Sequence, residues 1–166
     1  MPPLVASMIS LGFLGAVDTY FTATVFPVPV WVTFIAWASF FACGGGSQGL
    51  VKSVASNGTG ILIASASLLA IHLVPAYPIF AAIGVGLGTA VMIAVSARPL
   101  LNFPPAIVFG FASLVGTSVA TGTTIVTNGI NHPTVVAAAA MLLGGLFGYL
   151  SERGTQLLAR SGAAIA

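Results

Sequence analysis

Long apolar runs fill this chain and are interrupted only at prolines, glycines and small polar clusters. Within each run the residues are apolar on every side of a helix, whereas barrel strands alternate apolar and polar positions. A bilayer core about 30 Å thick takes roughly 20 helical residues. Dividing the chain at its interruptions predicts an all-α integral membrane protein with six transmembrane helices, at about 4–26, 29–46, 50–73, 78–97, 104–121 and 133–151. We expect one transmembrane domain over residues 1–152 and a short cytoplasmic tail over residues 153–166.

The composition supports a membrane protein. Of the 166 residues, 58% are hydrophobic and only 4% are charged, whereas a soluble domain carries about 25% charged residues. The four Lys and Arg residues form no cluster, which argues against a nucleic-acid partner. Cys43 is the single cysteine, so an internal disulfide and a multi-cysteine metal site are excluded. No basic segment precedes the first apolar run, so we expect a first transmembrane helix there and not a cleaved signal peptide.

The basic residues predict the orientation of the chain. With six helices, both termini and the loops near 47–50 and 97–103 lie on one side of the membrane. All the Lys and Arg residues fall on that side, at Lys52, Arg98, Arg153 and Arg160. Cytoplasmic loops are enriched in Lys and Arg. Both termini are therefore predicted to be cytoplasmic, with the opposite loops facing outward.

The second and fifth predicted helices begin alike. One reads "FPVPVWVTFIAWASFF" and the other "FPPAIVFGFASLVGT", and both later reach an aromatic-Ala-Ser step, at 37–39 and 111–113. Their alignment takes a three-residue gap, and proline is common at helix starts for local reasons, so chance similarity is the alternative. If the similarity reflects a repeat, the two three-helix halves are inverted, because each has an odd number of helices. Inverted halves recur in transporters, with the site between them.

Three blocks of sequence carry a family resemblance: "FACGGGSQGLVKS", "ARPLLNFPPAIVFGFASLVGT" and "AMLLGGLFGYLSERGTQLLAR". Over roughly residues 30–160 the chain resembles the YcdZ-like family of small bacterial inner-membrane proteins, a domain of unknown function. The resemblance implies a multi-pass protein of the bacterial inner membrane. It implies no substrate, cofactor or catalytic residue, and it is weakest over the first helix.

Asp18 lies in the outer half of that first helix. An ionisable group within a span costs about 2.5–3.5 kcal/mol on insertion scales and is a functional candidate by default. One interpretation is a cation or proton site, or a ligand for a solute amide or ammonium. The alternative is an interfacial carboxylate that accepts hydrogen bonds from Thr19, Thr22 or a neighbouring helix end.

Asn57 lies about two turns inside the third predicted helix and is followed by Gly58 and Gly60. The glycines would loosen the helix so that backbone carbonyls and the amide face a cavity. The alternative is a hydrogen bond from Asn57 to another helix.

Three hydroxyl residues complete the predicted solute pathway, although each could instead bond to its own helix. These residues are Ser39, Ser113 and Thr117. His72 and His132 lie far apart at the outer helix ends, so no metal site is predicted.

Glycines carry two further predictions. The segment from Gly44 to Gly49 is expected to end the second helix in a tight cytoplasmic turn. Small-residue motifs predict close helix contacts for the fourth and sixth helices, at Gly84-x-x-x-Gly88, Ala140-x-x-x-Gly144 and Gly144-x-x-x-Gly148.

Three classes of function compete. An enzyme is the weakest, because no nucleophile stands beside a base and no ligands cluster; no catalytic residue or cofactor is predicted. A channel or facilitative transporter for a small neutral or weakly charged solute fits best, since hydroxyls, amides and carbonyls can replace a solute's water shell. We expect such a protein to form a small homo-oligomer.

The alternative is a structural or accessory subunit of a larger membrane complex. A channel predicts a cavity lined by Asn57 and the hydroxyls of the second and fifth helices. An accessory subunit predicts that these residues pair with one another and leave no continuous path.

Overall fold

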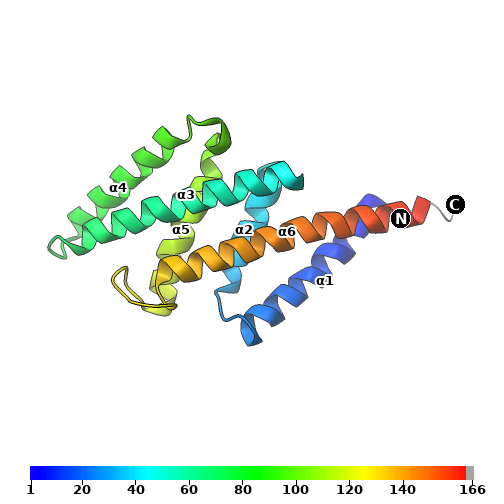
Figure 1. Cartoon of the computed structure of the whole chain (residues 1–166), viewed down its shortest axis with the longest axis horizontal. Helices are drawn as coiled ribbons and strands as arrows, with labels where there is room; N and C mark the ends of the chain where they lie inside the picture. The colour runs from blue at the N-terminus through cyan, green and yellow to red at the C-terminus, as the bar shows by residue number, and fades with distance from the viewer. Residues whose placement is uncertain (164–166) are drawn as a thin grey trace.

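The structure is a computed structural model that describes residues 1–163, with side chains described up to residue 160. The described residues form helices joined by short connections and contain no strand. The elements are α1 (Pro3–Thr24), α2 (Val30–Ala42), α3 (Gly46–His72), α4 (Pro78–Val95), the short 3₁₀ helix η1 (Pro99–Leu101), α5 (Pro104–Thr121) and α6 (Pro133–Ala163), all shown in Figure 1.

Prolines set several helix starts. Pro residues occupy the first turns of α1, α4 and α5, where a missing N–H removes no helical hydrogen bond. Glycine ends α5, because Gly122 adopts a left-handed conformation with φ 66°. These local signals explain why the predicted starts at residues 78, 104 and 133 coincide with the observed ones.

Five of the helices are long and apolar enough to cross a membrane, namely α1, α3, α4, α5 and α6. The apolar helix α2 is shorter, with 13 residues and a length of about 20 Å. It ends at Ala42, four residues before the predicted end at 46, because the glycine turn begins there. The all-helical membrane fold is therefore confirmed, whereas the count of six membrane crossings remains a prediction.

Residues 153–163, which were expected in a tail, continue α6 as one helix. Residues 164–166 lie outside the described part of the chain.

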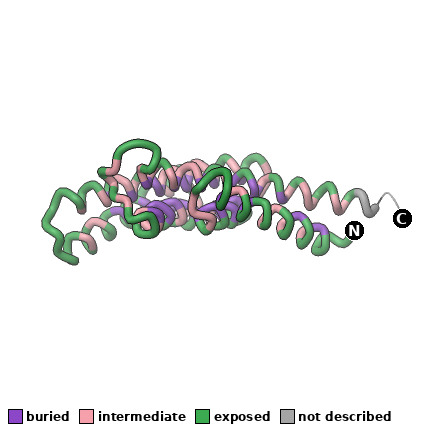
Figure 2. The backbone as a smooth tube through the Cα atoms, turned by 90° about the horizontal axis from the view of Figure 1, so that it is seen from below, coloured by how far each residue is buried: buried purple, intermediate pink, exposed green. Residues whose placement is uncertain are grey.

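The two longest helices, α3 and α6, run side by side in opposite directions, and α2 and α5 cross them (Figure 1). The most extensive helix contacts join α3 to α5 and α2 to α6. The outer helices are less enclosed: α1 rests mainly on α6, and α4 rests on α3. Buried residues accordingly gather in the middle of the bundle, while the helix ends are exposed (Figure 2).

Glycine allows the backbones to touch at both major crossings. A Cβ atom on Gly60 of α3 would overlap the carbonyl oxygen of Ile107 and would lie 2.7 Å from the backbone nitrogen of Phe111, both on α5. A Cβ atom on Gly144 of α6 would likewise overlap the carbonyl oxygen of Thr33 on α2. Only a residue without a side chain fits such contacts.

The predicted small-residue contacts are confirmed within the chain. Gly88 of α4 packs on Ser67 of α3, and Gly148 of α6 packs on Phe40 of α2. The prediction that glycines loosen the third helix is wrong, because α3 runs unbroken from Gly46 to His72. Gly60 brings α5 close and does not disturb the helix.

The predicted turn between α2 and α3 is also confirmed. Gly44, Gly45 and Gly46 have φ values of 101°, 67° and 63°, which disfavour any residue with a side chain. Glu152 of α6 fastens the turn, since its Oε2 accepts a hydrogen bond from the Gly46 backbone N–H at 2.7 Å. A carboxylate is favoured there because it faces the positive end of the α3 dipole.

We predict that Gly60→Ala destabilises the protein by about 3 kcal/mol, because the added methyl group must push α3 away from the α5 backbone. Gly58→Ala is the matched control, since no atom lies within 4 Å of the Cβ position at Gly58. The measurement is the free energy of unfolding in mixed detergent micelles. Equal stability of the two variants would contradict the close crossing.

Candidate membrane-embedded polar site

Three polar side chains meet between α2 and α3. Ser53 and Asn57 lie one turn apart on the same face of α3, and Ser39 lies opposite them near the end of α2. Ser39 Oγ donates to Asn57 Oδ1 at 2.9 Å, Asn57 Nδ2 donates to Ser53 Oγ at 3.2 Å, and Ser53 Oγ donates to Ser39 Oγ at 2.9 Å. We call these three residues the Ser39–Ser53–Asn57 ring.

Each member of the ring donates to the next and accepts from the previous one. Ser39 and Ser53 are fully buried and Asn57 is 2% exposed, so water does not compete for these hydrogen bonds. Closed chains of donors strengthen one another in a low dielectric. The hydrogen bond from Ser39 on α2 is the link to another helix that one of the two alternatives for Asn57 predicted.

A second polar contact joins α1 to α2. Asp18 Oδ2 lies 2.5 Å from Thr33 Oγ1, and Thr33 Oγ1 is also 2.7 Å from the carbonyl oxygen of Val30. Asp18 and Thr33 are both fully buried. Thr19 and Thr22 do not reach the carboxyl group, because their hydroxyls bond to backbone carbonyls of α1. The neighbouring helix, and not α1 itself, therefore supplies the partner of Asp18.

Several buried polar atoms have no hydrogen-bond partner within the described chain. They are Asp18 Oδ1, Ser56 Oγ, Ser113 Oγ, Thr117 Oγ1 and Thr155 Oγ1. Unpaired buried polar atoms are rare in proteins and each calls for an explanation, such as a role in binding. Three of the five residues, Asp18, Ser113 and Thr117, are among those expected to form the pathway.

A small pocket of about 170 Å³ opens between α3 and α6. Asn57 is the one polar side chain among its lining residues, which are Val54, Asn57, Gly58, Ile61, Ala138, Met141 and Leu142. A larger groove of about 400 Å³ between α3 and α4 is almost entirely apolar. Such apolar grooves are suited to lipid chains or to other helices, and not to a water-filled path.

The predicted site residues thus fall into separate groups. The structure joins Ser39 to Asn57 directly, whereas Asp18 has its own partner on α2. Ser113 and Thr117 are fully buried on α5, and their hydroxyls bond to no described residue. No hydrogen bond of the described chain links the three groups into a continuous path.

Two residues of these contacts, Ser53 and Thr33, were not among the predicted pathway residues. The spacing of Ser53 and Asn57 places both on one helix face, and this was a usable signal. Nothing local marks Thr33, since its partner is 15 positions away on another helix.

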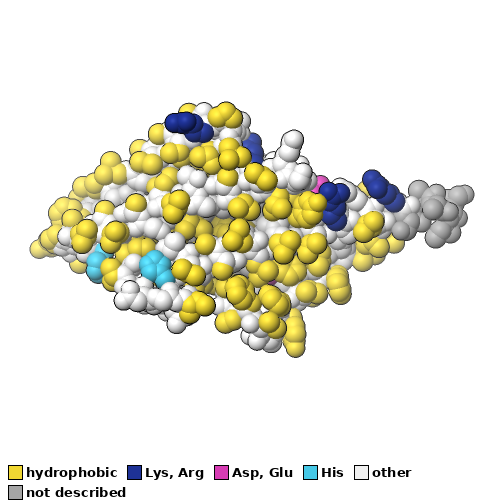
Figure 3. Space-filling model, in the orientation of Figure 1, with side chains coloured by type: hydrophobic (Ala, Val, Ile, Leu, Met, Phe, Trp, Pro, Cys, Tyr) yellow, Lys and Arg dark blue, Asp and Glu magenta, His cyan; other side chains and the backbone are white. Residues whose placement is uncertain are grey.

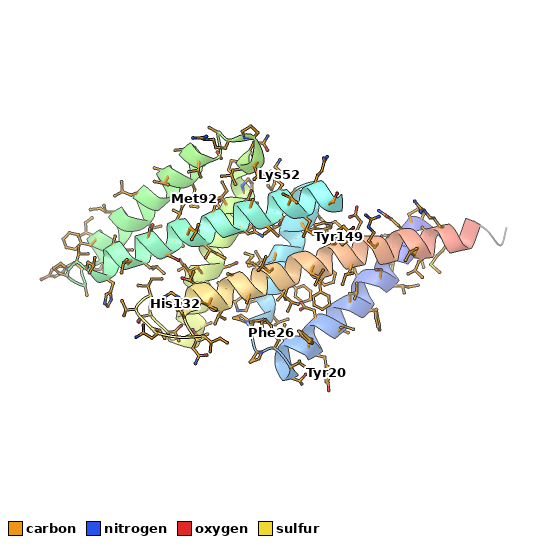
Figure 4. All side chains as sticks on the ribbon, in the orientation of Figure 1. Tyr20, Phe26, Lys52, Met92, His132 and Tyr149 are labelled. Atoms are coloured by element: carbon orange, nitrogen blue, oxygen red, sulfur yellow. The ribbon has the colours of Figure 1, made fainter. Side chains whose placement is uncertain are left out.

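The basic side chains of Lys and Arg lie in a different part of the bundle from the histidines. Lys and Arg lie along the upper and right-hand margins, and His lies at the lower left (Figure 3). Lys52 and His132 are labelled on opposite sides of the bundle in Figure 4, and Tyr20 and Phe26 lie away from Lys52. Within the described residues, no three His, Cys, Asp or Glu side chains come together as metal ligands.

We predict that Ser39→Ala and Ser53→Ala are non-additive, because each breaks the same ring. Their coupling free energy should be about 0.6–1.7 kcal/mol, the range measured for hydrogen bonds between membrane helices. Ser39→Ala and Ser65→Ala form the control pair, since Ser65 bonds to Ile61 and Thr134 outside the ring. Additive effects in both pairs would show that the ring does not act as a unit.

No curated protein and no solved structure matches this chain significantly. One family does match, described as "Protein of unknown function (DUF1097)", over residues 8–156. The matched segment runs from α1 into α6 and includes Asp18, Thr33 and the Ser39–Ser53–Asn57 ring. Membership says nothing of a link to YcdZ or of a bacterial origin, which remain predictions. With all but the chain ends covered, the protein belongs to the DUF1097 family.

Proposed function

We propose that the protein is a channel or facilitative transporter for a small neutral or weakly charged solute. In this proposal six helices cross the membrane as two inverted halves, α1–α3 and α4–α6, and the solute passes between them without chemical change. The support comes from helix packing, from equivalent residues and from a pocket.

The helix contacts are related by an exchange of the two halves. If α1, α2 and α3 are exchanged with α4, α5 and α6, the contact of α3 with α5 becomes that of α6 with α2. These are the two most extensive contacts of the bundle. The same exchange converts the packing of α1 on α6 into the packing of α4 on α3. Chance similarity of two helix starts does not account for such paired contacts.

Equivalent residues occupy the two crossings. Gly60 lies against Ile107 in one crossing, and Gly144 lies against Thr33 in the other. Thr33 and Ile107 are separated by the same number of positions as the two aromatic-Ala-Ser steps, so the alignment of those steps also makes Thr33 equivalent to Ile107. The weak sequence similarity and the packing therefore give the same alignment of α2 with α5.

A further pair of contacts agrees with that alignment. Trp37 Nε1 donates to Ser151 Oγ at 3.0 Å. In the other half, Phe111 is equivalent to Trp37 and Ser67 is equivalent to Ser151. Both lie against Gly88: a Cβ atom on Gly88 would be 3.0 Å from Phe111 and 2.5 Å from Ser67.

The pocket between α3 and α6 carries the proposal. The shift that relates Gly60 to Gly144 also relates Val54, Asn57 and Gly58 to Ala138, Met141 and Leu142. These six residues line the pocket together with Ile61, so the pocket lies on the axis that relates the halves. Transporters built from inverted halves bind their substrates at this position.

The chemistry of the pocket favours a neutral solute. Asn57 is its polar residue, and an amide offers both donors and an acceptor. In the present conformation the Ser39–Ser53–Asn57 ring uses these groups. Movement of α2 away from α3 would release the amide oxygen of Asn57 from Ser39, so that this oxygen could bind a solute. The structure therefore corresponds to a closed state.

The proposed location is the bacterial inner membrane, with both termini in the cytoplasm. The separation of Lys and Arg from His in Figure 3 supports this orientation. Association of several copies would cover the partly open pocket and the exposed apolar helix α4, in which only Gly88 and Met92 are buried.

One observation favours a second function, that of an accessory subunit. The ring satisfies its own members, and the larger groove beside it is apolar. A protein that only packs against a larger complex would need no more than this.

We predict that Asn57→Leu lowers solute flux about tenfold, which corresponds to about 1.4 kcal/mol in the barrier. The measurement is stopped-flow light scattering of proteoliposomes with a panel of small neutral solutes and ammonium. Thr59→Val is the matched control, because Thr59 lies on the same helix and bonds only to the Ala55 carbonyl. Circular dichroism and elution volume verify folding.

Flux from the wild type that falls in Asn57→Leu but not in Thr59→Val would support the pathway. No flux of any solute from folded wild-type protein would favour the accessory subunit.

A further inference from the structure

We infer that Asp18 and Thr33 form a proton-binding site, in which Asp18 holds a proton in the closed conformation seen here. The site lies where α1 meets α2 and α6, since Thr33 contacts Asp18 on one side and Gly144 on the other. It is distinct from the pocket and shares no hydrogen bond with the Ser39–Ser53–Asn57 ring.

Counting hydrogens identifies the proton. Thr33 Oγ1 has one hydrogen and two neighbouring oxygens, Asp18 Oδ2 and the carbonyl oxygen of Val30. Both neighbours would be acceptors if Asp18 were ionised, and the single hydroxyl hydrogen of Thr33 would then have to serve two short contacts. With a proton on Asp18 Oδ2, the carboxyl group donates to Thr33 and Thr33 donates to Val30. Each contact then contains one hydrogen.

The surroundings favour the neutral form. Asp18 is 0% exposed, and its Oδ1 has no partner among the described residues. An ionised carboxylate that has no counter-charge and keeps one oxygen without a partner is costly to bury, and such a group takes up a proton instead.

No titratable side chain faces this carboxyl group from the helices around it. Helix α2 contains none, and neither does α5. On α1 the exposed Tyr20 is the nearest in sequence. The titratable side chains in the described part of α6 all lie on the C-terminal side of Gly144. They are Tyr149, Glu152, Arg153 and Arg160.

Proton release requires water at Asp18. Helix α1 makes few contacts with α2, and Oδ1 needs a new partner once the carboxyl group is ionised. Separation of α1 from α2 would admit water, and the proton would pass from Oδ2 to that water. Because the closed state binds this proton and the open state releases it, a rise in pH favours the open state.

This consequence rests on the proposed transport function, whereas the proton-binding site does not. If the protein conducts a solute, its flux rises with the pH on the side to which Asp18 opens. Asp18→Asn keeps the shape and the donor of a protonated carboxyl group but cannot ionise, so it should remain closed at every pH.

Infrared spectroscopy tests the site without any solute. The chain has only two acidic side chains, Asp18 and Glu152, so their signals are separable by substitution. The full-length protein is measured at neutral pH in a detergent that contains no ester groups. We expect the carbonyl band of a protonated carboxylic acid, lost in Asp18→Asn and retained in the control Glu152→Gln. Absence of the band in the wild type, or its persistence in Asp18→Asn, would overturn the inference.

The flux assay provides the second arm. Wild-type flux should rise with external pH, and Asp18→Asn should show low flux that does not change with pH. Conduction without pH dependence in the wild type would refute proton-linked opening. A positive infrared result with no flux of any solute would support the proton site and contradict the transport proposal.

Discussion

The arrangement of the helices in this protein depends on direct contact between the backbones of crossing helices. At Gly60 and again at Gly144, the main chain of one helix lies against a carbonyl group of another, with no room for a Cβ atom. In lipid, where apolar side chains gain little by leaving their surroundings, such close packing is a main source of helix association. The positions of α2 and α5 at the centre of the bundle follow from these two contacts.

Close crossings also determine which polar groups meet. The backbone of α2 packs against α6 at Thr33. In this position, Ser39 of α2 contacts α3 and the side chain of Thr33 contacts α1. Polar side chains on a central helix must find partners within the protein, since lipid offers none. The Ser39–Ser53–Asn57 ring and the Asp18–Thr33 contact are the two results. Only the first satisfies all of its members, since Asp18 Oδ1 has no hydrogen-bond partner among the described residues.

Local signals in the sequence predicted the helices well, because prolines and glycines act within a single turn. The starts at Pro78, Pro104 and Pro133 and the turn at Gly44–Gly46 are examples. Helix crossings were predicted only in part. Gly144 belongs to a recognisable small-residue motif, whereas Gly60 stands beside Asn57 and was interpreted as a disturbance of the helix. The partner of a glycine depends on which helices cross, and a local sequence pattern does not indicate which helices cross.

Polar partners were the hardest feature to predict. Asn57 and Ser39 were both identified as candidates, yet their hydrogen bond joins residues 18 positions apart. For Asp18 the sequence left open a cation or proton site and an interfacial carboxylate, and in the structure the residue lies fully buried against Thr33. In both cases the type of residue indicated a need for a partner, and the tertiary packing decided which partner was available.

The arrangement of two opposed halves depends on whether the short helix α2 completes a membrane crossing. Labelling of single cysteines with a membrane-impermeant thiol reagent, in a Cys43→Ser background, measures this directly. Two inverted halves predict that Pro2→Cys, Asn102→Cys and Gln156→Cys are labelled from one side, and Val74→Cys and Asn128→Cys from the other. Labelling of Pro2→Cys and Gln156→Cys from opposite sides would give an odd number of crossings and would contradict the inverted halves.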